Sequence, residues 1–154
     1  MMIGLLRQLR SSALGRRNAP LNSIWQIIGW WEARRIPFNL IVGATGVVTS
    51  AVMLLTAVIS EYLTGEPIGM PDPPVIVVVA AVVFVAGANV CYTGGWIGEL
   101  LVRRAWPDES TTFGTLTFTL GLLFAVVVTL TPAVLTSSVA VLFWLARWLG
   151  YAGP

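Results

Sequence analysis

The chain has 154 residues, of which 56% are hydrophobic and only 10% are charged. Soluble domains usually carry about 25% charged residues, so this composition predicts an integral membrane protein. There is no histidine and only one cysteine, Cys91. A disulfide framework, a multi-cysteine metal site and a histidine general base are therefore excluded. We expect no cofactor, no metal and no enzymatic activity from this chain alone.

The basic residues are all arginines, and their placement predicts a membrane topology. Six precede the first uncharged run, two follow the second run and one closes the last: Arg7, Arg10, Arg16, Arg17, Arg34, Arg35, Arg103, Arg104 and Arg147. The charged residues between the first two runs are all acidic, namely Glu61, Glu66 and Asp72. Basic residues concentrate on the cytoplasmic side of membrane proteins. The arginines thus indicate contacts with the lipid bilayer and its anionic headgroups rather than with nucleic acid.

The N-terminal part is predicted to stay in the cytoplasm and on the membrane surface. Residues 1–18 form a basic cytoplasmic segment whose apolar start is too short for a signal peptide. Residues 19–36 carry apolar positions at helical spacing beside tryptophans and arginines. This pattern predicts an amphipathic interfacial helix. The alternative is an amphipathic helix that packs on neighbouring protein.

Residues 37–151 are predicted to form a bundle of four membrane spans. Runs that are long enough to cross a bilayer cover residues 38–60 and 75–98. The third uncharged run is too long for one span, and Thr131-Pro132 lies near its middle, so we expect a hairpin. The spans are expected at about 38–60, 75–98, 112–130 and 132–149. The predicted fold is an all-α integral membrane protein, an antiparallel four-helix bundle in a bacterial inner membrane, with both termini cytoplasmic.

Small residues recur at helix-face spacing in three of the spans. Lipid gives no hydrophobic drive for helix association, so small residues that allow close backbone contact are used instead. The interpretation is tight packing within the bundle or between protomers, and a pore lined by these stripes is the alternative. The glycines assigned to helix packing are Gly43, Gly46, Gly87, Gly94, Gly98, Gly114 and Gly121.

A second set of residues is more polar and belongs near the cytoplasmic boundary. Glu99 is its centre, because a carboxylate inside a membrane boundary is costly and marks a site by default. An ion pair with Arg103, Arg34 or Arg35 would make it structural, whereas a protonatable site or a lipid or partner contact would make it functional. The candidate cluster comprises Glu32, Arg34, Arg35, Asn39, Asn89, Tyr92, Trp96, Glu99 and Arg103.

Two motifs in these regions resemble a family of small bacterial four-span membrane proteins. One reads Trp30-Trp31-Glu32-x-Arg34-Arg35-x-x-Phe38-Asn39, and the other reads Asn89-x-Cys91-Tyr92-Thr93-x-Gly95-Trp96-x-x-Glu99-Leu100. The resemblance covers roughly the first two spans. It implies that these positions form a connected unit, and it implies no activity because none is known for that family.

The function expected from these patterns is association within the membrane. The chain would be a homo-oligomer or an accessory subunit of a membrane complex, acting through helix–helix and lipid contacts. The alternative is a transporter or channel for a small solute or ion, with Glu99 as its protonatable site. Small multidrug transporters carry a carboxylate in the middle of the first span, where this chain has none.

Overall fold

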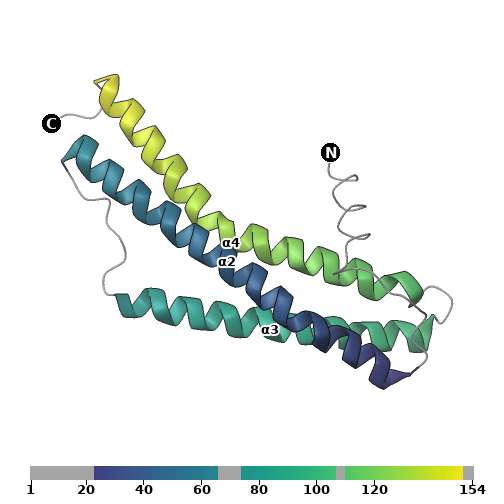
Figure 1. Ribbon diagram of the computed structural model, residues 1–154. Helices are drawn as coiled ribbons and strands as arrows, with labels where there is room; N and C mark the ends of the chain where they lie inside the picture. The colour runs from purple at the N-terminus through teal and green to yellow at the C-terminus, as the bar shows by residue number, and fades with distance from the viewer. Residues whose placement is uncertain (1–22, 66–73, 107–109, 151–154) are drawn as a thin grey trace. The chain divides into compact units, whose positions relative to one another are not determined.

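A computed structural model describes residues 23–65, 74–106 and 110–150 (Figure 1). Within these ranges the chain forms three long helices: α2 (Ile24–Thr64), α3 (Pro74–Ala105) and α4 (Ser110–Trp148). Each is long and apolar enough to cross a membrane, which marks the chain as a multi-pass membrane protein. The predicted basic segment, residues 1–18, lies outside the described residues.

The helices begin and end where the local sequence supplies starting and stopping residues. Ser23 precedes α2, and its carbonyl accepts from the backbone N–H groups of Gln26 and Ile27. Pro74 opens α3, as expected of a residue with a fixed φ and no N–H. Gly65 follows α2 and Gly150 follows α4, both with positive φ, the backbone conformation that commonly ends a helix.

The predicted hairpin within the third uncharged run is wrong, because α4 continues through Leu130 and Pro132 without a break. Helix reversal needs left-handed or turn-forming residues, and the positive-φ glycines of the described chain lie elsewhere. A turn in the hydrocarbon would also leave backbone groups unsatisfied. A membrane helix tolerates one proline where side chains supply hydrogen bonds. Pro132 removes the N–H that would donate to the carbonyl of Val128, and hydroxyls donate to the two carbonyls beside it: Thr131 to that of Val127 at 2.9 Å and Thr49 to that of Thr129 at 2.9 Å.

The predicted interfacial helix is not a separate element either. Residues 24–36 belong to the same continuous helix as the predicted first span, and Pro37 lies inside α2. Residues 19–22 lie outside the described ranges. The periodicity of residues 24–36 predicted the helix correctly, but treating Pro37 as a helix start placed a boundary where none exists.

The chain divides into two compact units, and all three helices contribute to both. The first, which we call the aromatic unit, contains residues 24–40, 82–106 and 110–125 among those described. In it α3 runs antiparallel to α2, because Trp31 contacts Glu99 whereas Asn39 contacts Asn89. Its buried core consists largely of ring side chains: Trp30, Trp31, Phe38, Tyr92 and Phe118.

The second unit, which we call the hydroxyl unit, includes residues 41–64 of α2 and 126–148 of α4. These two segments run parallel, since the partners increase together along both: Thr49 with Thr129, Thr56 with Ser137, and Ser60 with Trp144. The buried positions Val42, Thr49 and Thr56 are seven residues apart on α2, as are Ala133 and Ala140 on α4. A seven-residue spacing of this kind is typical of helices packed as a coiled coil.

Candidate functional site

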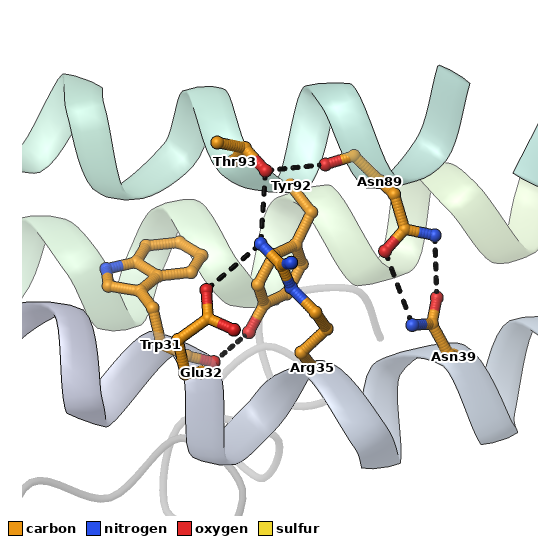
Figure 2. Close-up of polar contacts among 7 residues, drawn as sticks. All are labelled: Trp31, Glu32, Arg35, Asn39, Asn89, Tyr92 and Thr93. Carbon is orange, nitrogen blue, oxygen red and sulfur yellow. Dashed lines mark hydrogen bonds and ion pairs between the residues drawn. The ribbon is translucent and has the colours of Figure 1, made fainter. Parts of the chain in front are cut away.

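The residues of the predicted polar cluster meet between α2 and α3 in the aromatic unit, and they form two separate groups. One is a buried group around Glu99. The other is a row of partly exposed polar side chains (Figure 2). Each group joins residues of α2 to residues of α3.

The buried group, which we call the Glu99 clamp, consists of Trp31, Glu99 and Arg103. Glu99 has no solvent exposure and Trp31 is 2% exposed. The indole Nε1–H of Trp31 donates to Glu99 Oε2 at 2.8 Å. Arg103 donates to Glu99 Oε1 from Nε, and its NH2 also lies 3.0 Å from that oxygen. Both carboxylate oxygens are therefore held by strong donors, one of them from the neighbouring helix.

Aromatic side chains surround the clamp and fix the orientation of the Trp31 ring. Trp31 makes edge-on contacts with Trp30, Tyr92 and Phe118, with ring centroids 5.3 to 6.0 Å apart. Offset and edge-on pairs of this kind are favourable beyond their buried area. The hydroxyl of Tyr92 also donates to the carbonyl of Trp31, so α3 contacts both the ring and the backbone of this residue.

Gly95 makes room for the Trp31 ring. A Cβ at this position would lie 2.8 Å from Cη2 and 3.0 Å from Cζ3 of Trp31. Real Cβ atoms do not approach so closely, and the ring is packed on its other sides. A side chain at residue 95 would therefore push Trp31 away from Glu99.

The exposed group, which we call the polar row, consists of Glu32, Arg35 and Asn39 on α2 with Thr93 and Asn89 on α3 (Figure 2). Arg35 NH2 lies 3.0 Å from Glu32 Oε1 and donates to the Thr93 hydroxyl at 3.1 Å. The amides of Asn39 and Asn89 donate to each other at 3.3 and 3.2 Å. The Arg35 guanidinium also lies 5.5 Å from the centre of the Tyr92 ring.

Three members of the predicted cluster belong to neither group: Tyr92, which contacts Trp31, and Arg34 and Trp96. Arg34 stacks over the Trp30 ring at 3.9 Å and donates to the Trp30 carbonyl. Trp96 is partly buried and makes no hydrogen bond or ring contact with the described residues. Of the arginines considered for Glu99, Arg103 pairs with it, while Arg35 pairs with Glu32.

The cluster predicted from sequence lacked several residues that complete it. Trp31 and Thr93 each bond a member of the cluster, and Gly95 allows that contact to form. Trp31 lies on the predicted apolar face of its helix, for which the sequence left open contact with the membrane surface or packing on protein. Two features of the sequence could have indicated this contact. Trp31 is next to Glu32 in the first motif, and Gly95 and Glu99 in the second motif are four residues apart and so share one helix face.

The predicted packing glycines fall into two classes. A Cβ at Gly46 would lie 3.9 Å from Thr129 Cγ2, and one at Gly98 would lie 4.0 Å from Phe113 Cε1. Gly114 is buried. A Cβ at each of the other four would meet nothing within 4 Å of the described chain: Gly43, Gly87, Gly94 and Gly121.

The chemistry available to the site is that of holding helices together. A carboxylate with no exposure and a donor on each oxygen is stabilised in its charged form by its partners. No group of three or more metal-ligating side chains occurs among the described residues.

No family model, curated protein or solved structure matches the chain. The family resemblance of the two motifs therefore stays a prediction. The structure adds that the two motifs lie against each other, through Trp31 with Glu99 and Asn39 with Asn89.

Proposed function

We propose that this chain is a bacterial inner-membrane protein that acts by association, as a homo-oligomer or an accessory subunit, through helix–helix and lipid contacts. The observation that carries the proposal is an exposed seam along α3. Its members are spaced alternately by four and three residues, and all are exposed: Val83, Gly87, Val90, Gly94, Ile97 and Leu101.

The spacing and composition of the seam favour a helix partner over lipid alone. Alternation of three and four is the spacing by which paired helices interlock. Gly87 and Gly94 are seven residues apart, and their Cβ positions open to empty space. Glycine gives lipid little to contact, whereas it allows a second helix to approach closely. We take a second copy of this chain as the leading partner, with α3 against α3.

The geometry of Glu99 disfavours the transport alternative. A carboxylate that carries protons across a membrane must exchange them with water at some stage. Glu99 is fully buried and both its oxygens accept hydrogen bonds. This arrangement supports a structural role for Glu99, namely joining α3 to α2.

We also propose that each helix crosses the membrane once, with the N-terminus in the cytoplasm. Arg34 and Arg35 near the start of α2, and Arg103 and Arg104 at the end of α3, then lie inside, while Glu61 lies outside, as the positive-inside tendency favours. Arg147 at the end of α4 then lies outside. An odd number of crossings puts the C-terminus outside.

With Cys91 replaced by serine, a cysteine at Gly65 or Gly153 should react with an impermeant thiol reagent in intact cells, while one at Ser23 should not. Protection of Gly153 would contradict three crossings.

Disulfide cross-linking in native membranes tests the association. In the Cys91→Ser background, single cysteines at Val83, Val90 and Ile97 should form dimers on oxidation, because facing positions of two close helices come within disulfide range. A cysteine at Val139 of α4, which is equally exposed, is the matched control and should not. Adding Gly94→Leu should reduce dimer formation at Val90.

The other outcomes separate the alternatives. Cross-links only to a different protein would identify an accessory subunit. Equal cross-linking at Val90 and Val139 would mean that the seam is incidental. Absence of any cross-link, together with a pH-dependent ion flux in liposomes that Glu99→Gln abolishes, would favour the transporter.

A further inference from the structure

The polar row on the aromatic unit has open hydrogen-bonding groups that its internal contacts do not use. The ion pair between Glu32 and Arg35 uses one carboxylate oxygen and one guanidinium nitrogen. Glu32 Oε2 and Arg35 NH1 make no hydrogen bond with the described residues, and the buried Nε of Arg35 has no partner there either. The side chains are 45% and 34% exposed. A carboxylate oxygen of Glu32 and a guanidinium nitrogen of Arg35, of opposite charge, are thus both available to a ligand at neighbouring positions.

The α2 residues of the polar row lie where the charged part of the helix gives way to its uncharged run, which is where a membrane boundary is expected. Charge ends at Arg35, and residues 36–60 of α2 are uncharged. Glu32, Arg35 and Asn39 are three and four residues apart, so they share one face of the helix at successive depths. At a rise of about 1.5 Å per residue, Arg35 lies roughly 4.5 Å deeper than Glu32, and Asn39 about 6 Å deeper still.

Across from this face, α3 supplies matching polar groups. Thr93 lies level with Arg35, and Asn89 lies level with Asn39, as their hydrogen bonds require (Figure 2). Asn89 uses its amide also on the carbonyl of Val85 at 3.0 Å. Asn39 is exposed, which leaves its second amide N–H available to an acceptor at the start of the hydrocarbon.

We propose that the polar row binds the headgroup of a zwitterionic aminophospholipid, one with a phosphate diester and a primary ammonium. The order of groups along α2 matches the order along such a lipid. The outermost group, Glu32, would accept from the ammonium, Arg35 would bind the phosphate, and Asn39 would donate to a glycerol ester carbonyl. This inference rests on the proposed function only in taking the chain to act through lipid contacts.

The charge balance of the row selects among lipid classes. Arginine binds phosphate with charge-assisted hydrogen bonds, and every phospholipid offers that group. Glu32 adds discrimination, because a primary ammonium donates hydrogen bonds to a carboxylate whereas a trimethylated ammonium has no N–H to give. A headgroup without an amine, such as that of phosphatidylglycerol, would place no cation against Glu32.

Competition between lipids on the purified full-length protein tests the proposal. Native mass spectrometry from mild detergent would count bound phosphatidylethanolamine, phosphatidylcholine and phosphatidylglycerol offered in equal amounts. We expect wild-type protein to retain phosphatidylethanolamine over phosphatidylcholine by roughly tenfold or more, the factor that one charge-assisted hydrogen bond supplies. Glu32→Gln should abolish this preference, and Arg35→Gln should lower retention of both lipids.

The control is Glu61→Gln, the same chemical change at an exposed position near the other end of α2, which should keep the wild-type preference. The Glu32 change should not unfold the protein, because exposed ion pairs add little stability, and circular dichroism checks this.

Equal retention of the two zwitterionic lipids by wild type, or an unchanged preference in Glu32→Gln, would overturn the proposal. Preferential retention of phosphatidylglycerol would also overturn it and would indicate general attraction to the arginines. Lipid retention is counted per chain, on whichever monomer or oligomer mass is observed, so it can succeed or fail independently of α3 cross-linking.

Discussion

The aromatic unit and the hydroxyl unit are built from the same three helices, yet they hold those helices together by different means. In the aromatic unit, large rings pack around one buried carboxylate, and the contacts are specific to named atoms. In the hydroxyl unit, small residues allow α2 and α4 to approach, and single hydroxyls cross between them. A buried charge makes each of its partners indispensable, whereas hydroxyl contacts in a membrane are individually weak. Substitutions should therefore cost far more in the aromatic unit.

The largest effect is expected from Glu99→Gln. The change removes the charge that faces Arg103, whose side chain is largely buried, and leaves that guanidinium without its carboxylate. Removing one member of a buried pair typically costs about 3 kcal/mol or more. Thermal unfolding in detergent should show a clear loss of stability. Glu61→Gln, at an exposed position, is the control and should be nearly silent.

A double substitution sharpens this result. Combining Glu99→Gln with Arg103→Gln removes both charges and should recover part of the loss, which a double-mutant cycle measures. If the two losses simply add, the ion pair does not couple the residues and the clamp is not what stabilises this unit.

Two adjacent glycines on α3 give the next prediction. Gly95→Ala should cost about 1–3 kcal/mol, because the new Cβ overlaps the Trp31 ring. Gly94→Ala meets no atom within 4 Å and should be neutral or stabilising by up to about 1 kcal/mol in the monomer, since alanine favours helix. Chemical unfolding of both variants measures the difference. Equal behaviour would mean that Trp31 is not held against Gly95.

The smallest effect is expected in the hydroxyl unit. Thr56→Val keeps the shape of the side chain and removes its hydrogen bond to Ser137. Contacts of this type in membrane proteins average about 0.6 kcal/mol, so the unfolding midpoint should shift only slightly. Thr136→Val, which removes a hydroxyl bonded within its own helix, is the comparison. A loss at Thr56 as large as that of Glu99→Gln would reverse the contrast between the two units.

The sequence predicted the helical, membrane-spanning character because run length and charge exclusion are local properties. It also grouped Glu99, Arg103, Asn39 and Asn89 in one cluster, and the structure joins Glu99 to Arg103 and Asn39 to Asn89. It did not predict how the helices pair, because a Trp31 ring over Gly95 depends on two segments that meet only after folding. Pro132 was misread since proline alone does not reverse a helix, and the glycines that would do so are at residues 65 and 150.

The face of α2 that packs against α4 was also not predictable from small residues alone. The stripe of Asn39, Gly43, Gly46 and Ser50 suggested one packing face on α2, whereas the buried positions are Val42, Thr49 and Thr56. Small size permits close approach without demanding it. Which face is used depends on the partner helix, whose register is not encoded locally.

The length of α4 has a consequence for how the protein fits its bilayer. Its 39 residues extend about 58 Å as a continuous helix, while the hydrocarbon layer is about 30 Å thick. The part of α4 in the aromatic unit buries Phe118 and Leu122 against protein, so that apolar surface needs no lipid. The apolar length of α4 therefore need not equal the thickness of the bilayer. In a thinner bilayer, the residues of α4 that leave the hydrocarbon are ones that the aromatic unit already partly covers. The fold should therefore depend only weakly on acyl-chain length.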